Sequence, residues 1–130
     1  MIILGINETS HDASISLIKD GDILFAGHAE RYSKQKNDWY INDNLINDAL
    51  SYGMPDHIAY YEKPLLKASR LVLKGGAGDW LPKYNIKNRF GKTIPHTSFK
   101  HHYSHACAGY YTSKFDNAVI VVLEIGRAHV

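Results

Sequence analysis

Residues 2–32 read IILGINETSHDASISLIKDGDILFAGHAERY, and their pattern is the strongest indication of the fold class. An apolar run at 2–7 ends in the polar letters NETSHD, and residues 13–19 then alternate small or apolar side chains with polar ones. A third run, 23–32, follows the tight-turn sequence Asp-Gly-Asp at 20–22. Short runs of this kind, separated by such turns, are typical of antiparallel strands. The stretch therefore predicts a three-stranded antiparallel meander.

Helical and strand patterns alternate after the meander. We expect Asp43 to cap a helix that Gly53 and Pro55 end. The apolar face of this helix is expected to consist of Leu45, Ile46, Ala49 and Leu50. Residues 57–63, HIAYYEK, predict a buried strand, and residues 117–123, NAVIVVL, predict another central strand.

Three meander strands followed by helix, strand, helix and strand form the element order of an actin-like ATPase or ribonuclease-H-like domain. We therefore expect an α/β fold that corresponds to the N-terminal portion of such a domain. In this architecture the first hairpin turn faces phosphate groups. The turn GINETSHDAS, 5–14, could bind an anion through backbone N–H groups and the hydroxyl of Ser10 or Ser14. Its single glycine makes it unlike a P-loop, and a fold class alone does not give a function.

Composition narrows the class of protein. The chain has 130 residues, 45% of them hydrophobic and 22% charged, as in one modest soluble domain. It has no apolar run of transmembrane length and no signal-peptide pattern at its start, so we expect a cytoplasmic protein with no membrane partner. Cys107 is the single cysteine, which excludes an internal disulfide. We favour a role for it as a small buried hydrophobe over a role as nucleophile.

Charge gives a weaker indication. The formal net charge of +2 does not indicate a nucleic-acid partner, and we expect none. Residues 64–95 contain several glycines and prolines and predict a broken helical insertion or a long loop. Between residues 64 and 92 there are seven basic side chains against one acid, Asp79. They could meet phosphate groups, but a solvated surface is the interpretation that we favour.

The segment HHYSHACAGYY, 101–111, holds three histidines. In a helix His101 and His105 lie four residues apart and project from one face, at the spacing by which two imidazoles can hold one metal. His102 points elsewhere. The alternative is a helix whose histidines are ordinary half-buried polar residues. A metal site would also need a third ligand.

Three of these stretches together resemble a known family. Residues 5–38, GINETSHDASISLIKDGDILFAGHAERYSKQKND, with HHYSHACAGYY and NAVIVVL, look like the N-terminal actin-like domain of the O-carbamoyltransferases that act on nodulation factors and antibiotics. The resemblance implies a YrdC-like domain further along the chain and kinship with the enzymes that make threonylcarbamoyladenosine. It also implies a two-stage reaction. Carbamoyl phosphate and ATP give carbamoyl adenylate, and the carbamoyl group then passes to a hydroxyl of a sugar or antibiotic.

The resemblance also assigns residues. It implies a divalent metal, usually iron, held by His101, His105 and an aspartate of a V-V-L-D-G-x-G motif. This chain reads VVLEIG, so Glu124 stands where the aspartate is expected. The last seven residues, EIGRAHV, match letter for letter the translation of a common sequencing-adapter read, GAG ATC GGA AGA GCA CAC GTC. We therefore expect residues 124–130 to be non-native and residues 1–123 to be a fragment that lacks the C-terminal half and the YrdC-like domain. Such a fragment is expected to be inactive alone.

Further candidates follow from the same motifs. His11 and Asp12 match the family's H-D-A-S motif and could orient the acceptor hydroxyl or serve as base, next to Ser10. Alternatively, Asp12 bonds its own backbone in a turn. Glu30 and Arg31 match an E-R pair at the end of the third strand.

The E-R pair could bind the acceptor or a phosphate, or the two side chains could pair with each other on the surface. His102 could contact substrate or phosphate, or be a surface histidine. Two other functions remain open. One is a sugar-kinase-like ATPase of the same superfamily, and the other is a non-catalytic binding module.

Overall fold

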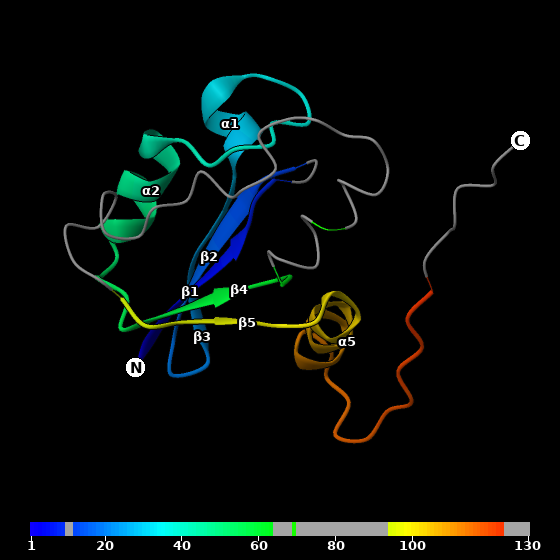
Figure 1. Ribbon diagram of the computed structural model, residues 1–130. Coiled ribbons are helices and arrows are strands. Elements are labelled where there is room, and N and C mark those ends of the chain that lie inside the picture. Colours follow the sequence, from blue (N-terminus) through cyan, green and yellow to red (C-terminus); the bar gives the residue numbers. More distant parts are fainter. Residues whose placement is uncertain (10–11, 64–68, 70–93, 124–130) are drawn as a thin grey trace, which may run out of the picture.

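The protein is described here by a computed structural model, which places residues 1–9, 12–63, 69 and 94–123. Five strands form one mixed sheet in the order β3-β2-β1-β4-β5 (Figure 1). Their bounds are β1 Ile2–Asn7, β2 Ser14–Lys19, β3 Asp22–His28, β4 His57–Tyr60 and β5 His96–Ser98. β1, β2 and β3 pair antiparallel, whereas β4 is parallel to both β1 and β5. The fold is therefore α/β, and the predicted meander is confirmed.

The turn between β2 and β3 has the conformation that its sequence demands. Asp20 and Gly21 both have positive φ angles, of 50° and 102°. Aspartate and glycine tolerate this left-handed region better than other residues do. The N-terminal ammonium of Met1 donates to the Asp20 carboxylate at 2.6 Å, and this contact lowers the pKa of that carboxyl.

The third strand is shorter than its sequence predicts. β3 ends at His28, and Ala29–Ser33 form the short helix α1. At the start of α1 the Ala29 amide donates to the Ala13 carbonyl at 2.8 Å, which continues the β2–β3 pairing by one residue, and the Ala29 side chain is completely buried. The prediction that Glu30 and Arg31 lie at a strand end is therefore wrong, because both are helical.

Helix α2 (Asp43–Leu50) covers one face of the sheet and builds the core. Its predicted apolar face is confirmed by the burial of Leu45, Ile46 and Ala49, while Leu50 is half-buried. The N-cap is Asn42, whose side chain accepts from the Leu45 amide at 3.0 Å, and not Asp43 as predicted. The asparagine side chain has the acceptor that satisfies the free amides of the first turn.

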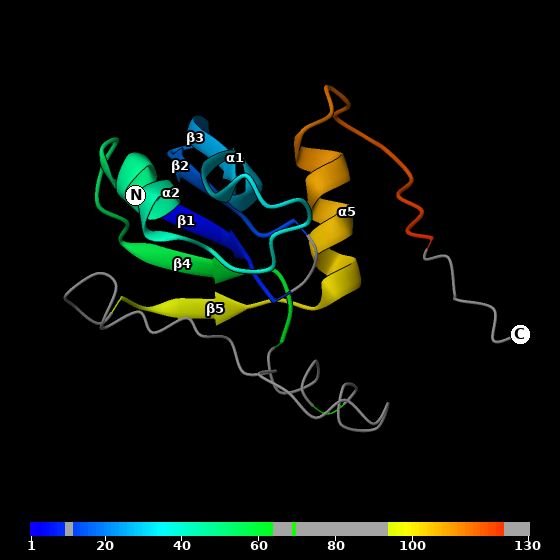
Figure 2. The same ribbon diagram turned by 90° about the horizontal axis from the view of Figure 1, so that it is seen from above.

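The later elements differ more from expectation. The predicted strand at 57–63 ends at Tyr60, and β5 was not predicted. Helix α5 (His101–Tyr111) is confirmed. The strand predicted at 117–123 is wrong: the segment has no strand pairing with the described residues and leaves the sheet beyond α5 (Figures 1 and 2). Of 64–95, only Ser69, Ile94 and Pro95 are described, so that prediction lies outside the described residues.

The exposure of 117–123 has a simple cause. A strand is stable only where a neighbouring strand bonds its N–H and C=O groups. The apolar side chains Val119, Val121 and Leu123 are 93%, 72% and 86% exposed.

Within the part of the chain that the structure describes, no helix is both long and apolar enough to cross a membrane.

Candidate functional site

The carboxyl ends of three parallel strands meet helix α5. The arrowheads of β1, β4 and β5 all point toward α5, which stands at that end of the sheet (Figure 2). In open α/β sheets, ligands bind outside the carboxyl ends of the strands. The residues that follow these strands are Glu8 after β1, Tyr61 and Glu62 after β4, and the histidines of α5 after β5. This edge is therefore the candidate site.

The two histidines meet as their spacing predicts. The Nε2 atoms of His101 and His105 are 3.1 Å apart, and the two rings are perpendicular with centroids separated by 4.5 Å. Two nitrogens bound at about 2.1 Å to one ion are about 3.0–3.4 Å apart when the bond angle lies between a right angle and the tetrahedral angle. The 3.1 Å separation is that of a hydrogen bond between the two rings, and it also matches the spacing of two nitrogen ligands on one metal ion.

The rest of a metal site is not found in the described residues. Residues 1–9, 12–63, 69 and 94–123 contain no group of three His, Cys, Asp or Glu side chains that could hold a metal. Glu124, the predicted third ligand, lies outside this set. His102 is exposed, and its ring centroid is 5.9 Å from that of His101. Its predicted substrate role stays a prediction.

Glu8 is a buried acid that the sequence did not reveal. Its side chain is fully buried, and Oε1 accepts the Ile41 amide at 3.1 Å. Two backbone bonds fix the same loop, from Thr9 N to Trp39 O at 2.9 Å and from Ala13 N to Asp38 O at 2.8 Å. The only signal in the sequence was an acid directly after an apolar strand.

The turn after β1 carries backbone strain. Thr9 and Asp12 have φ angles of 62° and 61°. A left-handed conformation costs roughly 1–2 kcal/mol for an ordinary residue, and it is rare for a β-branched one. The Asp12 carbonyl accepts from the Asn7 side chain at 3.2 Å. Ser10 and His11 lie outside the described residues, so the predicted roles of His11, Asp12 and Ser10 stay predictions.

Glu62 is the second acid that the sequence analysis missed. Its side chain is 5% exposed and directly follows the Tyr60–Tyr61 pair. Burial raises the pKa of Tyr60 to about 12; the negative charges of Glu8 and Glu62 act in the same direction, against a hydrogen bond with Thr9. The carboxylates of Glu8 and Glu62 therefore influence the ionisation of the Tyr60 phenol, and all three residues lie at or just after the ends of β1 and β4.

The E-R pair lies on a different element. Glu30 and Arg31 belong to α1, and the Glu30 carboxylate accepts the Asn37 amide at 3.3 Å. This bond spans seven residues and helps to close the loop that follows α1. The structure does not bring this pair into contact with the histidines, and its predicted binding role stays a prediction.

A pocket of about 590 Å³ lies between the sheet and α5. Its floor is a row of small residues on neighbouring strands, whose members pair directly in the ladder: Ala26, Ser16, Gly5 and Ala59. Side chains alternate between the two faces of a sheet, so this row faces away from α2. The wall on α5 consists of Tyr103, Ser104 and Cys107. Cys107 is half-buried, which modifies the prediction that it is buried.

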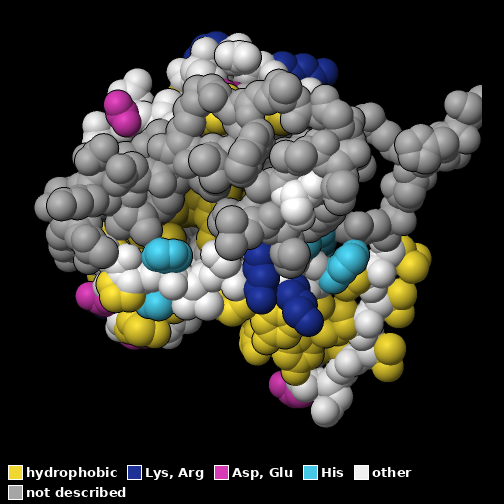
Figure 3. Space-filling view, in the orientation of Figure 1, with side chains coloured by type: hydrophobic (Ala, Val, Ile, Leu, Met, Phe, Trp, Pro, Cys, Tyr) yellow, Lys and Arg dark blue, Asp and Glu magenta, His cyan; other side chains and the backbone are white. Residues whose placement is uncertain are grey.

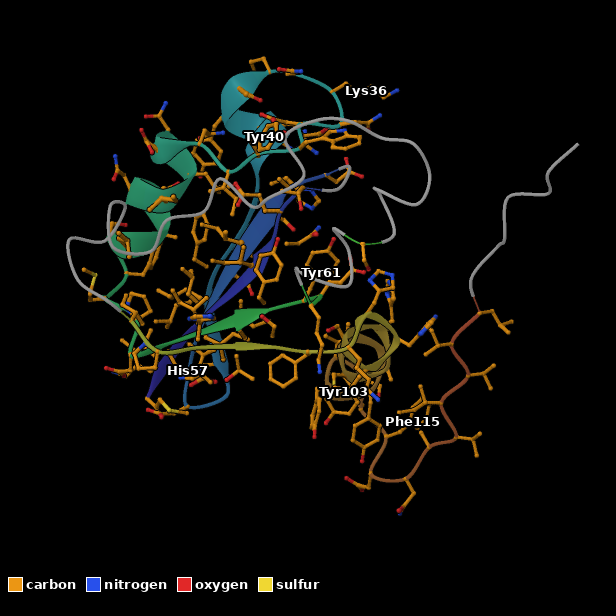
Figure 4. The ribbon with its side chains drawn as sticks, in the orientation of Figure 1. Lys36, Tyr40, His57, Tyr61, Tyr103 and Phe115 are labelled. Carbon is orange, nitrogen blue, oxygen red and sulfur yellow. The ribbon has the colours of Figure 1, made fainter. Side chains whose placement is uncertain are left out.

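The pocket and the histidine pair occupy different sides of α5. With 3.6 residues per turn, Tyr103 and Cys107 lie on one side of the helix, His101 and His105 lie on another, and Ser104 lies between them. Tyr61 adjoins both the pocket and the histidine pair, because it lines the pocket with Tyr103 and its ring lies 5.7 Å from that of His101 (Figure 4 labels both tyrosines). Hydrophobic side chains gather over this helix, with Lys or Arg and His side chains beside them (Figure 3).

Comparison with known proteins gives relatives but no established function. No protein-family model matches the chain. It is similar to the uncharacterized protein sll1178 of Synechocystis sp. The two are 29% identical over an alignment of 153 residues, which covers 94% of this chain and 25% of that protein. It is also similar to the uncharacterized protein MJ1051 of Methanocaldococcus jannaschii, with 32% identity over 129 residues, which cover 96% of this chain and 22% of that protein. The chain thus spans about a quarter of the length of these curated relatives.

Proposed function

We propose that this chain is the N-terminal part of an actin-like O-carbamoyltransferase domain, and that the edge beside α5 is half of its transfer site. The observation that carries the proposal is the 3.1 Å contact between His101 Nε2 and His105 Nε2 at the carboxyl ends of three parallel strands. The resemblance to the carbamoyltransferases and the much greater length of the two relatives support it.

The proposed reaction moves a carbamoyl group from carbamoyl adenylate to a hydroxyl of a sugar or other small-molecule acceptor. The acceptor oxygen attacks the carbamoyl carbon, the hydroxyl proton passes to a base, and AMP leaves with the electron pair of the broken C–O bond. A YrdC-like domain further along the protein would make carbamoyl adenylate from carbamoyl phosphate and ATP.

His101 and His105 would hold a divalent metal, with iron as the expected ion. When bound, the metal would supply Lewis-acid stabilisation of developing negative charge. Asp12, with His11, would orient the acceptor hydroxyl and accept its proton. Glu30, Arg31 and His102 would contact the acceptor or a phosphate.

Metal binding tests this proposal, measured on the purified protein whose sequence continues past Leu123 with its natural residues, so that the expected aspartate ligand is present. We expect close to one Fe(II), Mn(II) or Zn(II) per chain by elemental analysis, with binding lost in both His101→Ala and His105→Ala. His102→Ala is the matched control, because it removes a histidine from another side of the same helix and should retain the metal. A folded protein that binds no metal, or equal binding by all three variants, would contradict the proposal.

A further inference from the structure

Helix α5 is attached to the sheet through few side chains. None of its residues is buried, although it carries both histidines of the candidate site. Just before the helix, the Phe99 amide donates to the Tyr60 carbonyl at 3.0 Å, and the Phe99 ring stacks on Tyr103 with centroids 6.1 Å apart. Most helical stability in proteins comes from packing of an apolar face. The orientation of α5 therefore depends strongly on its individual polar contacts.

Ser104 makes a hydrogen bond from the first half of α5 to the sheet. Its Oγ lies 2.7 Å from the carbonyl oxygen of Tyr61 and 3.3 Å from that of Lys100, one turn back in the helix. A hydroxyl has one proton, and the shorter distance identifies Tyr61 as its acceptor. Serines inside helices often bond back to the carbonyl four residues earlier. Ser104 instead bonds across to the residue that follows β4.

Both histidines lie within one turn of this bond. Ser104 follows His101 by three residues and precedes His105 by one, so any movement of the helix at Ser104 moves both imidazoles. The Tyr61 ring also meets the His101 ring edge-on, with centroids 5.7 Å apart. Tyr61 thus fixes the helix through its carbonyl and one imidazole through its ring.

We propose that Ser104 is a positioning residue for the histidine pair. Its bond to the Tyr61 carbonyl holds α5 at the angle that places the paired Nε2 atoms of His101 and His105 at the carboxyl edge of the sheet, toward the residues that follow the strands. The inference deepens the proposed function and rests on it for the metal. The hydrogen bond between Ser104 and Tyr61 forms in the protein without metal, so it can be tested separately.

The test compares Ser104→Ala with Ser104→Thr, which keeps the hydroxyl. Thr112→Ala is the matched control, because the Thr112 hydroxyl bonds only to the Ala108 carbonyl within the same helix among the described contacts. Zn(II) affinity is measured by calorimetry and stability by urea unfolding without metal. Nuclear Overhauser effects between the Tyr61 and His101 rings report the position of α5 without metal.

We expect Ser104→Ala to lower Zn(II) affinity about 10-fold, the lower end of the range for residues bonded directly to metal ligands, because Ser104 acts on the histidines through the helix backbone. Its urea midpoint should shift no more than that of Thr112→Ala, and Ser104→Thr should restore the affinity. The ring-to-ring signal should weaken in Ser104→Ala alone. If wild-type protein binds no metal but the Tyr61–His101 signal weakens in Ser104→Ala alone, the proposed function is wrong and the positioning role of Ser104 is supported. Unchanged affinity and an unchanged ring signal in Ser104→Ala would overturn the inference.

Discussion

Replacing Glu8 tests how the turn after β1 is held. Its carboxylate is fully buried and accepts the amide of Ile41, 33 residues further along the chain, at 3.1 Å. In Glu8→Ala the Ile41 amide, on a residue that is 3% exposed, loses its hydrogen bond to the Glu8 carboxylate.

The size of the effect follows from the kind of bond. A hydrogen bond to a charged group contributes roughly 1.5–3 kcal/mol, so we expect Glu8→Ala to lower the free energy of unfolding by about 2 kcal/mol. For a domain of this length, this corresponds to a fall of about 8 °C in Tm. Glu8→Gln keeps an acceptor oxygen at the same reach and should cost less than about half as much.

Two measurements check this reasoning. Urea unfolding gives the free energies of the wild type and both variants, and amide hydrogen exchange reports the Ile41 amide directly. We expect faster exchange at Ile41 in Glu8→Ala and near-normal protection in Glu8→Gln. Equal destabilisation by Ala and Gln would refute the hydrogen-bond explanation and assign the role of Glu8 to its charge. Unchanged Ile41 protection in the Ala variant would refute it as well.

Three further substitutions have defined outcomes. Tyr60 ionises near pH 10 when unfolded and at about 12 when folded; its raised pKa contributes stability below pH 10 that is lost as the pH rises toward 12, up to about 2–3 kcal/mol. Tyr60→Phe should therefore flatten the fall in urea stability over this pH range, and an unchanged slope would contradict the burial argument. Lys34, at φ 60°, ends α1: Lys34→Gly should raise the free energy of unfolding by about 0.5–1 kcal/mol, whereas Lys34→Ala should not. A Cβ at Gly27 would lie 2.8 Å from Leu45 Cδ1, so Gly27→Ala should cost roughly 1–3 kcal/mol in urea unfolding, and the cost should shrink in a Leu45→Ala background.

Local sequence was sufficient for elements whose partners are near in the chain. The three meander strands, the Asp20–Gly21 turn and the apolar face of α2 follow from side-chain periodicity and turn chemistry within a few residues. The histidine pair belongs to the same group, because four-residue spacing in a helix brings two side chains together wherever the helix lies. Within this group the prediction of the α2 N-cap was wrong by one residue, because Asn42 caps the helix and not Asp43.

Distant contacts decided the rest. The run at 23–32 reads as strand throughout, but its pairing with β2 ends at His28 and Ala29, and the chain continues as α1. Segment 117–123 has strand composition, yet composition cannot supply a neighbouring strand. The apolar run that precedes Glu8 predicts a strand, whereas the hydrogen bond from the Ile41 amide to the buried Glu8 carboxylate joins residues 33 positions apart.

The sequence by itself therefore determined the meander and the histidine spacing, because these depend on the regular geometry of single elements. The tertiary structure alone decided that β1, β4 and β5 direct their carboxyl ends at α5, and that Ser104 bonds to Tyr61, 43 residues earlier. Parallel pairing and side-chain bonds between distant elements depend on where the whole chain folds back, and no local pattern encodes that position.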